Sequence, residues 1–299
     1  MLRRVVLLIA LLAISAGAGW YLLRPLRYPA REPAAHVAAT ASATAEPSIE
    51  ETSAATETPA PTETPGAAAS IAPSPSTEVS GPRLALIVDD CGQWLDVERG
   101  FIALPVPLTM SVLPHVHGTA AIAQEAHDAG KGVMLHLPMD TLSGLNPGPG
   151  EVKTTMTDAE VTAQTEDDLA QVPLAAGVNN HEGSKGSADA RVMKDVIAVL
   201  RQHGDLFFID SRTNAASVGE SVARDAGVPT ASRDVFLDNK ADVAYTEGQL
   251  REAIAIAKRN GSAIAIGHPR PTTLAAVKAM LPEFRDDGVQ LVLAQPLTH

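Results

Sequence analysis

The sequence is poor in cysteine, in aromatic residues and in basic residues, and these shortages exclude whole classes of site. The single cysteine, Cys91, rules out an intramolecular disulfide framework. Neighbouring carboxylates raise rather than lower the pKa of a thiol, so we interpret Cys91 as a packing residue and not as a nucleophile. Residues 83–299 hold 18 basic and 28 acidic residues, a net charge of −10, which argues against nucleic acid as a partner.

Basic residues are missing altogether from residues 32–82, which carry seven acids and many Ala, Thr, Pro and Ser residues. A segment of this composition cannot bury enough apolar surface to offset the entropy lost on ordering. We therefore predict a disordered linker over residues 28–82, followed by one folded domain over residues 83–299.

The longest apolar run, residues 5–23, lies near the N-terminus between arginines. Its length is close to the roughly 20 residues that a membrane-spanning helix needs. We expect residues 1–27 to form a single-pass anchor in a bacterial inner membrane, with the rest of the chain in the periplasm. The alternative is secretion to the periplasm after signal cleavage, because residues 16–18 (Ala-Gly-Ala) resemble a cleavage site.

Within residues 83–299, short apolar runs alternate seven or eight times with segments of helical pattern. This alternation predicts an α/β fold with parallel strands, either a barrel or a doubly wound sheet. The Thr-Asp-Ala-Glu pattern at 157–160 is typical of a capping box and predicts a helix start. Residues 143–150, rich in Gly and Pro, are too long for a plain connection and predict a loop over a site. Residues 230–235 are predicted as one short segment.

The run at 84–92 ends in two adjacent carboxylates, Asp89 and Asp90. Active sites of α/β folds gather at the carboxyl ends of strands. Side chains alternate along a strand, so one carboxylate can bind a metal while its neighbour handles a proton. In the alternative interpretation, Asp89 caps the following helix and Asp90 is merely solvated.

Further polar residues follow other predicted strands. A hydrolytic metal site needs about three protein ligands and an open position, and Asp90, His136 and His181 supply such a set from three strands. For His136, a buried histidine bonded to the backbone is an equally good interpretation. We interpret His115 and His117 as loop residues, with ligation the less favoured alternative.

His268 follows another buried strand, where an imidazole could protonate a leaving group or simply stabilise a turn. Asp210 or Arg212 could orient this histidine or the metal ligands, and Asn180 is assigned to the same supporting set. Asp234 and Asp238 are interpreted as residues that cap or solvate turns.

Seven short motifs occur in order along residues 83–299: IVDDCG (87–92), LPH (113–115), HLPM (136–139), GVNNHEGS (177–184), FIDSRT (208–213), RDVFLDN (233–239) and GHP (267–269). As a set they resemble the divergent polysaccharide deacetylase family, a branch of the NodB-like carbohydrate esterases. The resemblance implies a deformed (β/α) barrel of about seven strands. It also implies removal of acetyl groups from a polysaccharide, assisted by a divalent metal, usually zinc.

Carried over by position, the resemblance makes Asp89 the general base, Asp90 a metal ligand and His268 the general acid. Ordinary members of the superfamily have a second histidine a few residues after the position of His136. That histidine is missing here, and we assign its place to His181. The Arg-Pro motif of ordinary members is also absent, and residues 179–184 occupy its position.

We therefore expect a metal-dependent hydrolase that removes acetyl groups from an envelope polysaccharide. The low aromatic content, 3%, counts against an extended stacking platform, although Trp94 could supply one contact. One alternative is a catalytically inactive module that binds glycan or a protein partner in the envelope. Another is hydrolysis of a non-carbohydrate amide or ester at the same metal.

Overall fold

The computed structural model describes residues 81–299. The predicted anchor over residues 1–27 and nearly all of the predicted linker over 28–82 lie outside these residues. In the part that is described, no helix is both long and apolar enough to cross a bilayer.

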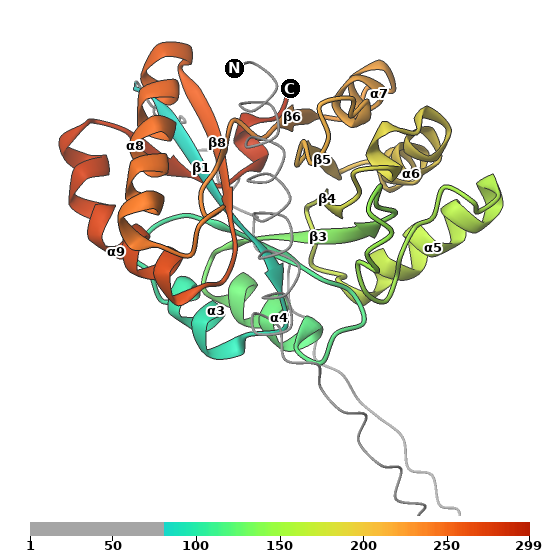
Figure 1. Cartoon of the computed structure of the whole chain (residues 1–299), viewed down its shortest axis with the longest axis horizontal. Coiled ribbons are helices and arrows are strands. Elements are labelled where there is room, and N and C mark those ends of the chain that lie inside the picture. The colour runs from blue at the N-terminus through green and yellow to red at the C-terminus, as the bar shows by residue number, and fades with distance from the viewer. Residues whose placement is uncertain (1–80) are drawn as a thin grey trace, which may run out of the picture. The chain divides into compact units, whose positions relative to one another are not determined.

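Strands and helices alternate along the described chain (Figure 1). The strands are β1 (Arg83–Cys91), β2 (Thr109–Val112), β3 (Gly132–Met139), β4 (Gly177–Glu182), β5 (Phe207–Asp210), β6 (Thr230–Ser232), β7 (Val235–Phe236), β8 (Ser262–Gly267) and β9 (Gln290–Val292). The helices are α3 (Leu95–Ile102), α4 (Thr119–Asp128), α5 (Asp158–Gln171), α6 (Ala190–His203), α7 (Gly219–Asp225), α8 (Val243–Asn260) and α9 (Pro271–Asp286), with short 3-10 turns η1 (Gly186–Ala188) and η2 (Gln295–Leu297).

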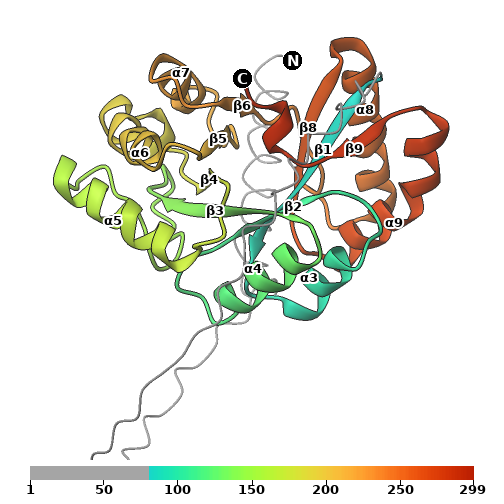
Figure 2. The same cartoon turned by 180° about the vertical axis from the view of Figure 1, so that it is seen from behind.

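All strand pairs are parallel, in the order β6-β5-β4-β3-β2-β1-β8-β7, and β9 pairs with β1. Figures 1 and 2 show this sheet curled, with the helices around its outer face. The predicted parallel α/β fold is therefore confirmed. The sheet has nine strands rather than about seven, and among the described residues β6 and β7 do not pair, so the barrel is open there.

The predicted short segment over residues 230–235 is divided between the two edges of this opening. Arg233 N donates to Asp210 O at the end of β5 (3.0 Å), and Asp234 N donates to Ile264 O on β8 (2.9 Å). The Asp234 carboxylate also accepts from Ile264 N (2.8 Å). These bonds carry the chain across the gap. Asp234, interpreted from the sequence as a turn residue, thus bonds to the neighbouring strand.

Side-chain alternation divides the strands between two apolar clusters. On β1, Leu84, Leu86 and Val88 belong to the large cluster that contains the buried helix residues. Ala85 and Ile87 belong to a smaller cluster, which we place inside the curled sheet. Its members are Ala85, Ile87, Met134, Phe207, Ile209, Ala231, Ile264, Ile266, Ala294 and Leu297.

The C-terminal segment closes one end of this interior. Ala294 N donates to the Thr109 hydroxyl (3.1 Å), and Thr230 and His299 exchange two backbone hydrogen bonds (3.2 and 3.3 Å). Thr109 and Thr230 are the first residues of β2 and β6, so this closed end is the amino end of the strands. The carboxyl ends remain available for a site, as in other parallel barrels.

The predicted capping box begins α5. The Thr157 hydroxyl accepts from Glu160 N (3.3 Å), and the Glu160 carboxylate accepts from Thr157 N (2.7 Å). Two amide groups that would otherwise lack partners at the helix start are thereby satisfied.

Candidate active site

The end of β1 directs two carboxylates into the open mouth of the barrel. Asp89 continues the inward series of Ala85 and Ile87 and is almost fully buried. Asp90 has a left-handed backbone, with φ 59°, and the pairing of β1 with β2 shifts register there. Strict alternation would aim Asp90 away from Asp89. The irregularity instead brings both carboxylates to His136, with Asp89 Oδ2 3.6 Å and Asp90 Oδ1 3.2 Å from Nε2.

Asp89 does not cap the helix that follows, contrary to the alternative interpretation. The amide groups of Gln93 and Trp94 donate instead to Glu98 Oε1, at 3.0 and 2.7 Å. Glu98 is itself fully buried. Glu98 therefore holds the turn before α3, and Asp89 faces the site.

Three donor atoms from three strands meet at the mouth. Asp90 Oδ1 lies 2.9 Å from His181 Nδ1 and 3.2 Å from His136 Nε2, and the two nitrogens lie 3.1 Å apart. Bonds of about 2.0–2.1 Å to a tetrahedral zinc ion set its ligands roughly 3.3 Å apart. The triangle formed by Asp90, His136 and His181 thus has the size and the donor types of a zinc site.

The triangle is poorly satisfied without a cation. Asp90 Oδ1 is buried and has no hydrogen-bond partner of good geometry among the described residues. Burial alone would raise the pKa of Asp90, but the adjacent imidazoles of His136 and His181 hold it well below its ordinary value. Asp90 is therefore a carboxylate at any pH near neutrality, the form that binds a divalent metal.

Asn179 sets the tautomer of His136. Its Oδ1 lies 2.8 Å from His136 Nδ1, and its Nδ2 donates to Asp89 Oδ1 (2.8 Å) and to the Ser211 hydroxyl (3.2 Å). Because the amide oxygen can only accept, His136 Nδ1 carries the proton and the Nε2 lone pair faces the triangle. Asn179 also connects the histidine to Asp89.

The family comparison bears directly on this arrangement. The family model for divergent polysaccharide deacetylases matches residues 86–298. The chain belongs to the divergent polysaccharide deacetylase family.

The chain is also similar to two proteins in sequence and to one in structure. An uncharacterized protein of Haemophilus influenzae is 36% identical over 210 residues, which cover 70% of this chain and 74% of the relative. The uncharacterized protein YibQ of Escherichia coli is 34% identical over 224 residues, which cover 75% and 70%. The crystal structure of an uncharacterized protein from Agrobacterium tumefaciens has the same fold, with a TM-score of 0.69 at 24% identity over 75% of this chain and 92% of that one.

In this family member, His268 has a buried acidic partner. His268 Nδ1 lies 2.9 Å from Asp238 Oδ1, and Nε2 lies 3.8 Å from Asp90 Oδ2. The other oxygen of Asp238 accepts from His268 N (2.8 Å) and from the Thr273 hydroxyl (2.7 Å). Asp238 thus fixes both the backbone and the ring of His268, a role that its interpretation as a turn residue missed.

Charge pairing shifts the pKa of both groups. Burial would lower the pKa of His268, but the Asp238 hydrogen bond and the nearby carboxylates raise it above its ordinary value. Burial would raise the pKa of Asp238, but His268 lowers it. For Asp89, burial dominates and raises the pKa, although His136, His268 and Asn179 oppose the shift.

The three predicted supporting residues, Asp210, Arg212 and Asn180, bond to or lie in the segment after β5. Asp210 accepts from the Ser217 hydroxyl (2.7 Å) and from Arg212 N (2.8 Å), which shapes the segment after β5. Asn180 Oδ1 accepts from Ser211 N (2.9 Å) on that same segment. None of the three bonds to the metal triangle, although Asn180 and Arg212 line the pocket.

The pocket over the triangle has a volume of about 380 Å³. It is lined by Asp89, Asp90, His136, Asn180, His181, Glu182, Ser211, Arg212, Thr213, Arg233, Phe236, Asn239, Ile266 and His268. Arg233 was missed by sequence reasoning. Its guanidinium lies 5.0 Å from the centre of the Phe236 ring, and Nε donates to Ser211 O (2.7 Å). Trp94 is not among the lining residues.

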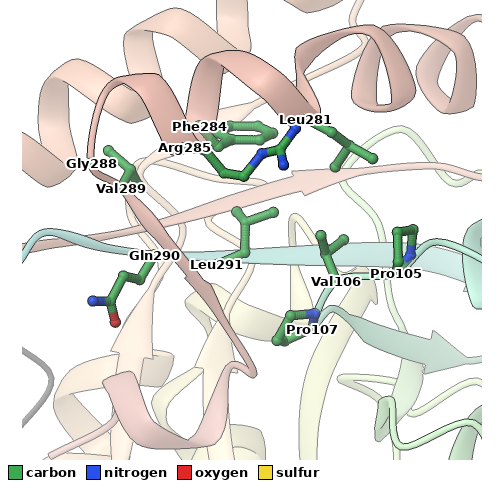
Figure 3. A pocket seen from close by; sticks show the side chains of 10 residues that line it. All are labelled: Pro105, Val106, Pro107, Leu281, Phe284, Arg285, Gly288, Val289, Gln290 and Leu291. Atoms are coloured by element: carbon green, nitrogen blue, oxygen red, sulfur yellow. The ribbon is translucent and has the colours of Figure 1, made fainter.

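A larger cavity of about 650 Å³ lies elsewhere, between α9, β9 and the segment before β2 (Figure 3). Its walls include Pro105, Val106, Phe284 and Leu291, and the only charged side chain there is Arg285. It holds none of the carboxylates or histidines described above. Chemistry, and not size, therefore identifies the candidate active site.

We predict that Asn179→Ala weakens zinc binding about 10–100-fold, because the amide that orients His136 is lost. Isothermal titration with zinc measures the effect. Asn180→Ala is the matched control, since its side chain holds the segment after β5 and touches no donor atom of the triangle. Equal affinity losses in the two variants would contradict the role assigned to Asn179.

Proposed function

We propose that this protein is a metal-dependent hydrolase that removes acetyl groups from an envelope polysaccharide. The observation that carries the proposal is the convergence of Asp90, His136 and His181 on one point, with Asp89 and His268 beside them. Membership in the divergent polysaccharide deacetylase family supports the class of reaction and of substrate.

The donor set fits a divalent metal, and zinc suits two imidazoles and one carboxylate best. A bound metal would polarise the acetyl carbonyl and make a water molecule more acidic. His136 Nε2, His181 Nδ1 and an oxygen of Asp90 would hold this metal, which agrees with the bond between Asn179 and His136 Nδ1 and with the low pKa of Asp90.

Asp89 would accept the proton of the attacking water. It is buried beside the triangle, and burial raises its pKa towards the range in which a carboxylate is an effective base. Asn179 Nδ2 donates a hydrogen bond to Asp89 Oδ1, and Asp89 Oδ2 lies on the side of His136 and the triangle.

His268 would donate a proton to the leaving amine or alkoxide. Asp238 occupies Nδ1, so Nε2 is the nitrogen that faces the carboxylates across the pocket. The raised pKa of His268 favours the protonated ring, which is the form that can donate a proton.

Acetate release from acetylated glycans tests this proposal. We predict that the zinc-loaded protein releases acetate and that Asp89→Asn lowers kcat at least about 100-fold, because a general base contributes on that order. Asp89→Asn should leave the zinc stoichiometry unchanged. The rival, an inactive glycan-binding module, predicts binding without acetate release and binding unaffected by Asp89→Asn. Release of acyl groups only from non-carbohydrate substrates would favour the third alternative.

The pH profile tests the role of His268. Activity should fall as the pH rises through the raised pKa of His268. In Asp238→Asn the negative charge is gone, so the pKa falls and the basic limb of the kcat profile should move to lower pH. Asp234→Asn is the control, because Asp234 bonds to Ile264 and not to His268. An unshifted basic limb in Asp238→Asn would contradict the assignment.

We also propose that residues 1–27 anchor the chain in a bacterial inner membrane and that the domain lies in the periplasm. The apolar run at 5–23 supports this placement. Fractionation of cells that express the full chain should recover it with the inner membrane. Recovery in the soluble periplasmic fraction, with a mass that lacks the first residues, would favour signal cleavage.

A further inference from the structure

A second group of metal-binding side chains lies outside the candidate active site. His115 follows β2, and Asp167 and Asp168 lie near the end of α5. His115 Nε2 is 3.0 Å from Asp167 Oδ2 and 3.0 Å from Asp168 Oδ1. None of these residues lines the pocket over Asp89 and Asp90, and the first interpretation of His115 as an ordinary loop residue did not foresee the contact.

Asp168 is the unusual member of the group. Its side chain has no exposed surface, although Asp167 and His115 keep 58% and 26% of theirs. Oδ1 also accepts from Gln164 Nε2 (3.1 Å), whereas Oδ2 is buried with no hydrogen-bond partner among the described residues. The orphan oxygen belongs to the same carboxylate that faces His115. A buried carboxylate oxygen without a partner is costly, and burial raises the pKa of Asp168 to about 8, so this group either takes up a proton or binds a cation.

The charges around the group are unbalanced. Within the described chain, no Lys or Arg lies within ion-pair distance of Asp167 or Asp168, and His115 is their one ionic contact. The last turn of α5 also carries no basic residue. Carboxylates near a helix C-terminus are unfavourable, because the aligned peptide dipoles favour positive charge there. A divalent cation would offset both effects.

The backbone is packed closely around Asp168. Gly150 ends the Gly- and Pro-rich stretch predicted to cover a site, and a Cβ there would lie 2.3 Å from Asp168 Oδ1 and 3.1 Å from Pro114. Gly150 therefore lies against the second group, and none of residues 143–150 lines the candidate active-site pocket. Three segments of the chain meet at Asp168: the segment after β2, the segment before α5, and α5 itself.

We propose that His115, Asp167 and Asp168 bind a second divalent cation, of the zinc class, which ties the segment after β2 to α5. One imidazole nitrogen and two carboxylates are donors that zinc accepts, and the exposed side of His115 and Asp167 leaves room for water as a further ligand. Calcium suits the group less, because it takes 6–8 oxygen ligands. The inference is independent of the proposed deacetylase activity, since it uses none of the active-site residues.

The zinc content of the full chain, after dialysis against metal-free buffer, tests the proposal. We expect two zinc ions per chain in the wild type, one in Asp90→Ala, one in Asp167→Asn, and none in the double variant. Zinc should also raise the Tm of Asp90→Ala and leave the Tm of the double variant unchanged. Asp167 is exposed, so Asp167→Asn should fold normally, which circular dichroism checks.

His203→Ala is the matched control. His203 Nε2 lies 2.9 Å from Glu166 on α5, but both side chains are exposed and this pair contains only one carboxylate. Loss of the His203 side chain should therefore leave two ions bound. One ion in the wild type, one in Asp167→Asn and none in Asp90→Ala would overturn the proposal of a second site. If the active site binds no zinc but the second site does, the wild type and Asp90→Ala should each hold one ion and Asp167→Asn should hold none.

Discussion

The contact of one carboxylate with two imidazoles organises the mouth of this barrel. Asp90 Oδ1 is buried and lies within 3.2 Å of nitrogens from β3 and β4. Its left-handed backbone costs on the order of 1–3 kcal/mol. A strained, charged and underbonded group persists only where the surrounding structure holds it, and such strain is concentrated at functional sites. A cation at this point would relieve the electrostatic part of that cost.

The barrel interior supports this contact through its layers. One layer of the interior is apolar and consists of Ile87, Met134, Ile209 and Ile266. The residue two positions later in each case is polar, which gives a second layer of Asp89, His136, Ser211 and His268. Period-two alternation makes this switch from apolar to polar occur at one level around the barrel. The C-terminal segment fills the opposite end with Ala294 and Leu297. The polar layer therefore faces the mouth, and a substrate that covers the mouth would exclude water and strengthen the electrostatic interactions there.

Much of this could be predicted from the sequence, because strand periodicity and strand ends are local signals. The parallel α/β fold, the capping box of α5 and the list of residues at strand ends all come from such signals, and the structure brings Asp90, His136 and His181 together. Asn179 could have been found as well, since it precedes His181 by two positions and therefore shares its side of β4. Sequence reasoning selected its neighbour Asn180 instead.

The features that could not be predicted from the sequence depend on contacts between residues far apart in the chain. The irregularity at Asp90 depends on pairing with β2, and the division of residues 230–235 between two strands depends on where the barrel stays open. The partnership of Asp238 with His268 spans 30 residues, and that of His115 with Asp168 spans 53. No local pattern encodes these pairs. The most direct measurement is a crystal structure of the zinc-loaded protein with anomalous scattering: the account predicts an ion bonded to Asp90 Oδ1, His136 Nε2 and His181 Nδ1 at about 2.0–2.2 Å. Zinc density that avoids these three atoms would contradict it.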